Sequence, residues 1–201
     1  MSPIKIVFFD IGGVYAKGTG SYVINRVSCL LNSRIEDVQK IFHDIWSEFG
    51  IGNIAEEEYY QRLSSKLGID TKTLAEMWTA EEMFAINPDI ESIIIKLKGK
   101  NYTVASITDV DPVHLKIHLE KGNYKIFDFV IDSVNAKSTK RSGKDIYRKA
   151  IEMAKAKPHE CVMIDDTPEK LVAAKELGIH TILFESAEKL RNDLNHLGVD
   201  F

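Results

Sequence analysis

The stretch Ile-Lys-Ile-Val-Phe-Phe-Asp-Ile-Gly-Gly, residues 4–13, decides the fold of this chain. Residues 6–9 are β-branched or aromatic, which predicts a strand buried on both sides in a parallel sheet that helices cover. Asp10 follows at the carboxyl end of that strand, the edge at which open α/β sheets bind ligands. Gly12 and Gly13 allow a sharp turn or a close backbone approach to a ligand. The alternative is a strand end with a capping Asp and a turn.

Composition and charge limit the classes of protein to which the chain can belong. Of its 201 residues, 44% are hydrophobic and 28% are charged, enough for a core and a hydrated surface. The net charge of -4, without a basic block, argues against nucleic acid as a partner. No apolar run approaches the ~18 residues that a membrane-spanning helix needs, and from the residues before the first strand we expect no leader segment. Two cysteines, Cys29 and Cys161, make no disulfide framework. We therefore expect a cytoplasmic protein whose partners include no nucleic acid and no membrane.

Helix and strand signals divide the chain into two parts. Between residues 16 and 87 only helical spacing occurs. The expected helices there begin at Ser21 and, with a capping box, at Ser33, and continue at 55–67 and 71–83. From residue 88 onward, helices alternate with expected strands at 102–107, 127–132, 160–164 and 181–184.

The fold class that follows is α/β, a doubly wound parallel sheet with an inserted α-helical cap. We expect residues 1–15 and 88–201 to form the α/β core domain, because the strands lie there. Residues 16–87 are too long for one crossover connection and are expected to form a helical cap domain.

Three of the predicted strands end in polar side chains at the same edge of the sheet. Asp10 follows the first strand, Thr108 and Asp109 end the second, and Asp165 and Asp166 end the fourth. Each group alone fits a helix cap. Neighbouring carboxylates favour a cation, and several carboxylate oxygens suit Mg²⁺ better than zinc. The coincidence at one edge therefore predicts a magnesium site.

A metal ion beside a carboxylate suggests phosphoryl transfer. With Mg²⁺ neutralising the charge, Asp10 can attack phosphorus in line and form an aspartyl phosphate, which water resolves. Thr108 can hydrogen-bond a phosphate oxygen, and Lys140 can compensate the remaining charge. The expected catalytic residues are Asp10, Thr108 and Lys140, and the expected substrate-binding residues are Thr108, Asp109, Gly13 and Lys140.

These motifs resemble those of the haloacid dehalogenase (HAD) superfamily, in the phosphatase-like branch with a helical cap after the first strand. Residues 8–14 resemble its first motif, which carries the nucleophile; residues 104–109 resemble the second and residues 161–169 the fourth. The resemblance implies a Rossmann-like core and a small-molecule phosphate ester as substrate. It also implies Mg²⁺ held by Asp10, the Gly12 carbonyl, Asp165 and Asp166.

Some positions depart from the family pattern. Phosphatases of this superfamily usually have a second Asp two residues after the nucleophile, as the general acid, and here that residue is Gly12. Losing a general acid costs ~10²–10⁴ in rate, so we expect aryl, acyl or anomeric phosphates to be preferred over alkyl phosphates. The third motif is usually Lys-Pro. Here Lys140 is preferred for it, with Arg141 and Lys144 as alternatives. Lys170 stands where the family often has Asn or Asp.

Two other functions fit parts of the pattern. A catalytically weak relative that binds phosphate ligands or a protein partner would explain Gly12. A 2-haloacid dehalogenase would use Asp10 to attack carbon without a leaving-group acid, but Asp165 and Asp166 would repel a carboxylate substrate. Within the cap, the loop of residues 50–53 is expected to approach the site. His114 and His118, at i, i+4 spacing, are expected to pack or to lie at the surface rather than to bind zinc.

Overall fold

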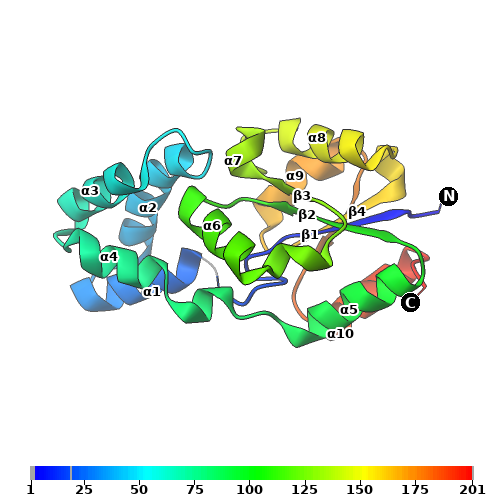
Figure 1. Ribbon diagram of the computed structural model, residues 1–201, viewed down its shortest axis with the longest axis horizontal. Helices are drawn as coiled ribbons and strands as arrows, with labels where there is room; N and C mark the ends of the chain where they lie inside the picture. The colour runs from blue at the N-terminus through cyan, green and yellow to red at the C-terminus, as the bar shows by residue number, and fades with distance from the viewer. Residues whose placement is uncertain (1–2, 19, 201) are drawn as a thin grey trace.

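A computed structural model describes residues 3–18 and 20–200 of the chain (Figure 1). Five strands form one parallel sheet in the order β3-β2-β1-β4-β5. They are β1 (Ile6–Phe9), β2 (Thr103–Thr108), β3 (Val130–Asp132), β4 (Cys161–Asp165) and β5 (His180–Leu183). The strand that comes first in the chain lies at the centre of the sheet, since Ile6 pairs with Thr103 on one side and Cys161 on the other. The α/β class predicted from the sequence is confirmed.

Helices cover both faces of this sheet (Figure 1). Val7 and Phe9 pack against α5 (Pro88–Gly99) and α10 (Ala187–His196). Ile6 and Phe8 point to the other face, toward α8 (Asp145–Ala154) and α9 (Pro168–Glu176). The remaining elements of this part are the ten-residue helix α6 (Pro112–Lys121) and the short elements α7 (Ser133–Ala136), η2 (Asn123–Ile126) and η3 (Pro158–Glu160). All four residues of β1 are buried, as an apolar strand covered on both faces requires.

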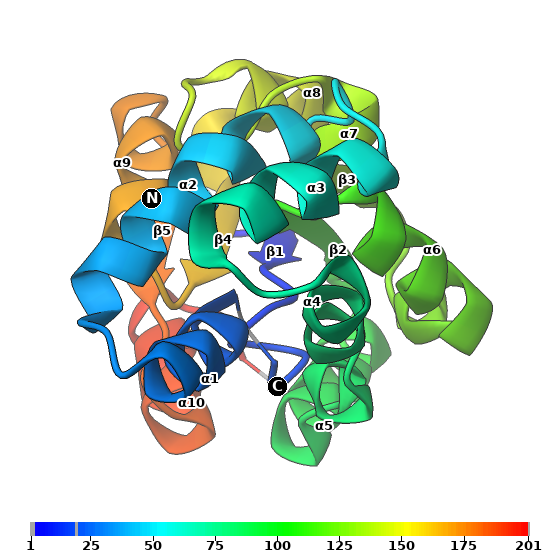
Figure 2. The ribbon, with the colours of Figure 1, turned by 90° about the vertical axis from the view of Figure 1, so that its left-hand side faces the viewer.

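A block of helices between residues 20 and 84, here called the helical block, packs around its own apolar cluster. It consists of α1 (Gly20–Leu31), α2 (Ile35–Phe49), α3 (Glu56–Leu67), α4 (Thr71–Trp78) and the 3₁₀ turn η1 (Glu81–Phe84). Figures 1 and 2 show it beyond the carboxyl ends of the strands, with α2 and α3 across them. The division into domains at residues 15/16 and 87/88 stays a prediction.

Some helix boundaries differ from those expected. Helix α1 was expected to begin at Ser21 but already includes Gly20. Helix α2 is capped at Arg34 without a side-chain hydrogen bond, and the Ser33 hydroxyl donates to the Leu31 carbonyl instead, so the Ser33 capping box is wrong. Helix α4 ends at Trp78 rather than at residue 83. The indole Nε1 of Trp78 donates to Asp111 Oδ2 over 3.1 Å, which ties the end of this helix to the core. Such a long-range contact leaves no local signal in the sequence.

Two chain segments join the helical block to the sheet, and they run side by side. The Lys17 N–H donates to the Ala85 carbonyl over 2.8 Å, and the Asn87 N–H donates to the Tyr15 carbonyl over 2.8 Å. Gly18 lies so close to Met83 that a Cβ on Gly18 would be 2.3 Å from the Cα of Met83, so this position requires glycine.

In the described part of the chain, no helix is long and apolar enough to cross a lipid bilayer.

Candidate active site

A buried ion-pair cluster lies at the carboxyl edge of the sheet. Asp10 leaves β1 and Asp165 ends β4, the neighbouring strand, so their carboxylates face one another. The Nζ of Lys140 lies 2.8 Å from Asp10 Oδ2 and 2.5 Å from Asp165 Oδ2. All three side chains are almost inaccessible to solvent. A buried lysine is costly unless its charge is compensated, and here two carboxylates compensate it.

Asp109 positions the loop that carries Lys140. Its Oδ1 accepts a 2.8 Å hydrogen bond from the Lys140 backbone N–H. The same loop is closed on itself, because Thr139 and Ser142 exchange hydrogen bonds between their backbone N–H groups and hydroxyls. The polar residues on either side of Lys140 are the only sign of this turn in the sequence.

The two alternative cations of the third motif lie elsewhere. The Nζ of Lys144 pairs with Glu176 at 2.9 Å on the surface. Arg141 is exposed, and its Nη2 lies 4.0 Å from Glu169 Oε2. Of the three, Lys140 is therefore the one that contacts Asp10.

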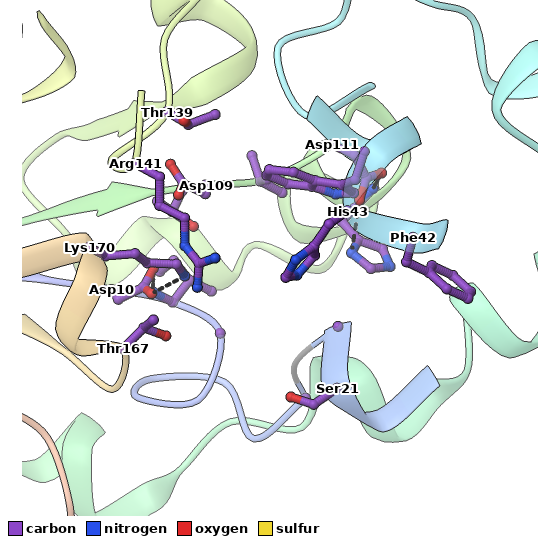
Figure 3. Close-up of a pocket in the computed structure, with 18 of the residues that line it drawn as sticks. Asp10, Ser21, Phe42, His43, Asp109, Asp111, Thr139, Arg141, Thr167 and Lys170 are labelled. Carbon is purple, nitrogen blue, oxygen red and sulfur yellow. Dashed lines mark hydrogen bonds and ion pairs between the residues drawn. The ribbon is translucent and has the colours of Figure 1, made fainter. Parts of the chain in front are cut away.

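Lys170 is a second cation at Asp10, and sequence reasoning assigned it no role. Its Nζ lies 3.4 Å from Asp10 Oδ2, drawn as a dashed line in Figure 3. The residue sits in the first turn of α9, and its backbone carbonyl accepts the hydroxyl of Tyr147 from α8. The departure from the family pattern at this position was the available signal, but a helix position alone does not say that the side chain reaches Asp10.

These charges set the protonation states in the cluster. Burial alone would raise the pKa of Asp10, but Lys140 and Lys170 hold that pKa down to about 2. Burial, followed by the negative charge of Asp10, raises the pKa of Asp165 to about 7. Burial would lower the pKa of Lys140, but Asp10 and Asp165 raise that pKa well above its ordinary value. Asp10 is therefore a carboxylate and Lys140 an ammonium at neutral pH.

Three carboxylates come close enough to share one cation. Oxygens of Asp10, Asp165 and Asp166 all lie within 4.8 Å of one another. Asp166 is less buried, and its Oδ1 accepts from the Thr167 hydroxyl, while Asp165 Oδ1 accepts the Thr167 N–H. An all-oxygen donor set of this kind suits Mg²⁺. The donors present thus fit the expected metal ion.

The remaining expected site residues are not all brought together. Thr108 ends β2, is buried and lines the same cavity as Asp10. Gly12 lines the cavity as well. Gly13 does not line it: its N–H donates to the Ala16 carbonyl over 2.8 Å and its φ is +81°. A positive φ favours glycine, so Gly13 serves the turn after β1.

A cavity of about 690 Å³ opens over this cluster, between the sheet edge and the helical block. In Figure 3, Arg141 from the core and His43 from α2 both point into it above Asp10. The loop at residues 50–53 was expected to approach the site, and one of its residues, Ile51, lines the cavity. The Nζ of Lys137 donates to the Ile51 carbonyl over 2.7 Å. Ser133 also donates to the Gly50 carbonyl, over 2.5 Å.

Most of the sequence matches a known protein family. Residues 4–178 match the haloacid dehalogenase-like hydrolases, which is most of the chain. The chain belongs to this family. The protein is thus a HAD-like hydrolase, as the sequence motifs predicted.

Two curated relatives of this HAD-like hydrolase differ in length. It is 22% identical over 179 residues to sesquiterpene phosphatase astK of Aspergillus oryzae, covering 87% of both chains. It is 19% identical over 164 residues to drimenol cyclase drtB of Aspergillus calidoustus, covering 79% of this chain but 31% of that protein. The HAD-like hydrolase thus corresponds to about a third of the length of the cyclase.

Solved structures share the fold. A HAD family enzyme of Bacteroides thetaiotaomicron, in complex with magnesium and inorganic phosphate, is 21% identical with a TM-score of 0.72, covering 93% of this chain and 98% of that one. A protein of Porphyromonas gingivalis, solved as a predicted HAD-like family hydrolase, is 22% identical with a TM-score of 0.77 over 100% of both chains. At these identities the likeness shows the fold of the HAD-like hydrolase.

Proposed function

We propose that this protein is a Mg²⁺-dependent phosphohydrolase that acts on a small phosphorylated metabolite through an aspartyl phosphate on Asp10. The observation that carries the proposal is the buried cluster in which Lys140 Nζ contacts both Asp10, at 2.8 Å, and Asp165, at 2.5 Å. Of these three residues, Asp10 lines the cavity. The phosphatase activity named for astK and the phosphate and magnesium in the Bacteroides enzyme support it.

Asp10 is suited to act as the nucleophile because it is ionised and held in place. Its Oδ1 accepts a 2.7 Å hydrogen bond from the Ile11 N–H, and its Oδ2 faces both lysines. These contacts fix the carboxylate for in-line attack on phosphorus, which forms the new O–P bond as the ester oxygen departs. Water then attacks the aspartyl phosphate and releases phosphate.

Mg²⁺ would be held by Asp10, Asp165, Asp166 and the Gly12 carbonyl. When bound, it supplies charge neutralisation between the carboxylates and the phosphate. Among the chain's own groups, the buried Thr108 hydroxyl is available to hydrogen-bond a phosphate oxygen. Lys140 and Lys170 add positive charge where negative charge gathers during transfer.

The leaving group receives no proton from residue 12, because that residue is Gly12. Three other carboxylates that could be considered for this role already have partners. Asp109 accepts the Lys140 N–H, Asp111 caps α6 and accepts from Trp78, and Glu48 pairs with Arg62. We therefore propose that esters with good leaving groups, such as aryl, acyl or anomeric phosphates, react faster than alkyl phosphates.

The negative charges of Asp165 and Asp166 argue against the alternative function of a 2-haloacid dehalogenase. A 2-haloacid is a carboxylate, and Asp165 and Asp166 lie beside Asp10, where its charge would be repelled. The alternative of a catalytically weak binding protein rests on the same Gly12 and predicts a site that takes up phosphate mimics without turnover.

One experiment separates these functions. Beryllofluoride with Mg²⁺ mimics an aspartyl phosphate, so ¹⁹F NMR should show a bound species that Asp10→Asn abolishes and that the exposed control Asp145→Asn retains. Phosphate release from phenyl phosphate should show the same pattern. Binding without turnover favours the weak relative, halide release from 2-haloacids favours the dehalogenase, and a wild type that neither binds the mimic nor releases phosphate refutes the proposal.

A further inference from the structure

The two sides of the cavity differ in charge. The core side carries Asp10, Asp109 and Asp166 together with Arg141 and Lys170. Among the described residues of the helical block, none that lines the cavity is Asp, Glu, Lys or Arg. We call the residues of the helical block that line the cavity the uncharged wall. Its large apolar side chains include Ile24, Ile35, Phe42, Trp46, Met83 and Phe84.

This lack of charge is specific to the side of α2 that faces the cavity. The same helix carries Glu36, Asp37, Lys40, Asp44 and Glu48, none of which lines the cavity. The cavity-lining positions of α2 recur every three or four residues, from Ile35 through Gln39, Phe42 and His43 to Trp46 and Ser47. The helix thus turns its charges to solvent and its neutral face to the site.

The apolar surface of this wall is not all covered by the protein. Ile35 stands at the start of α2 with 49% of its surface exposed, although it lines the cavity. The cavity, at about 690 Å³, is in the range of sites for drug-sized molecules and is far larger than a phosphate group needs. Space therefore remains beside the wall for the organic part of a substrate.

We propose that the substrate is a phosphate monoester of an uncharged, largely apolar alcohol or phenol, whose organic part lies on the uncharged wall. This rests on the function proposed above. The hydroxyls of a sugar would lose water there without gaining enough partners, since the wall offers chiefly Asn25, Gln39, His43 and Ser47 as polar groups. The carboxylate of a phosphorylated amino acid would meet no cation on this wall.

The test uses 4-alkylphenyl phosphates from methyl to hexyl, which share one leaving-group acidity. Because each methylene removed from water favours binding, kcat/KM should rise about two- to fourfold per added methylene until the cavity is filled. A chain of the same length that ends in a carboxylate should react at least about tenfold more slowly. Glucose 1-phosphate should also be a poor substrate despite its good leaving group.

A matched pair of variants assigns the effect to the wall. Ile35→Asn makes a cavity-lining apolar residue polar, and Leu30→Asn does the same to a residue that is 58% exposed but does not line the cavity. Neither change touches a buried core. Ile35→Asn should reduce the rise in kcat/KM from the methyl to the hexyl compound at least about threefold, and Leu30→Asn should leave the whole series unchanged.

The outcomes distinguish the two proposals. Turnover with a flat alkyl series, or equal rates with the carboxylate compound, overturns the apolar substrate and leaves the phosphohydrolase in place. A steep series that Ile35→Asn and Leu30→Asn affect equally overturns the assignment to this wall. If no ester is hydrolysed and beryllofluoride does not bind, both proposals fall.

Discussion

Lys140→Met removes a side chain that contacts both Asp10 and Asp165 while nearly preserving its length. In the metal-free protein it leaves two buried carboxylates without the cation between them. Removing one partner of a buried ion pair typically costs about 3–5 kcal/mol. Part of this is visible in Asp10 alone: a pKa of about 2, against 3.8 for a free Asp, corresponds to about 2–3 kcal/mol of folding stability.

The measurement is urea unfolding at pH 7 with a chelator present. Lys144→Met is the matched control, because Lys144 was one of the two alternatives to Lys140 for the third motif and pairs with Glu176 on the surface. That surface pair should cost less than about 1 kcal/mol. If the two variants lose similar stability, the buried cluster does not hold the site together as we argue. Added Mg²⁺ should recover part of the loss in Lys140→Met, since it neutralises the same carboxylates.

The pH dependence gives a second check on the same change. The depressed pKa of Asp10 contributes stability that is present above pH ~4 and is lost as the pH falls toward about 2. Without Lys140, burial raises the pKa of both Asp10 and Asp165. Protonation at lower pH therefore removes the cost of holding these two negative charges buried in the variant. The stability gap between wild type and Lys140→Met should therefore narrow from pH 7 to pH 4. A gap that does not depend on pH would contradict this reasoning.

His118 is buried, and burial, then the nearby His114, lowers its pKa to about 4. Between pH 6.5 and 4 the unfolded chain thus binds a proton that the folded chain does not, so the free energy of unfolding should fall by up to about 3 kcal/mol as the pH is lowered over that window. In urea titrations, His118→Gln should make the free energy of unfolding depend less on pH. An unchanged dependence would show that His118 is not its source. Lys170→Asn removes a positive charge 3.4 Å from Asp10, so calorimetry should show Mg²⁺ binding at least about tenfold more tightly. The exposed control Lys175→Asn should leave the affinity unchanged, and equal affinities in both variants would contradict the argument. Gly12→Asp should raise hydrolysis of alkyl relative to aryl phosphates about tenfold or more, whereas Gly12→Asn should not; the same result for both variants would show that the acid is not what is missing.

Most of the sheet and its chemical edge followed from the sequence. Strand runs such as residues 6–9 carry a local pattern, and the polar residues after them must meet at one edge because the strands are parallel. The third strand was expected from residue 127 but is regular only from Val130. Before it, the Asp128 side chain rather than its backbone accepts the Val104 N–H, over 2.9 Å. When a side chain replaces a backbone carbonyl as the acceptor between two strands, the periodic pattern of the sequence does not reveal it.

The parts of the site that depend on loop conformation could not be predicted. The choice among Lys140, Arg141 and Lys144 depended on a turn closed by Thr139 and Ser142, which only the folded loop shows. The contact of Lys170 with Asp10 joins residues far apart in sequence, and so does the contact of Trp78 with Asp111. Gly13 was expected at the substrate, yet its N–H serves the turn, because a glycine pair does not reveal which member approaches a ligand.

The central place of β1 in the sheet has a consequence for biosynthesis. Phe9 pairs with Ser106 and with Ile164, so β1 leaves the ribosome about 150 residues before its second neighbour in the sheet. At 5–20 residues per second, that is a wait on the order of ten to thirty seconds. During this time an apolar segment without its partners is exposed to chaperones and to other nascent chains. We expect the yield of folded protein to depend on translation speed through residues 10–165 more than on the final stability.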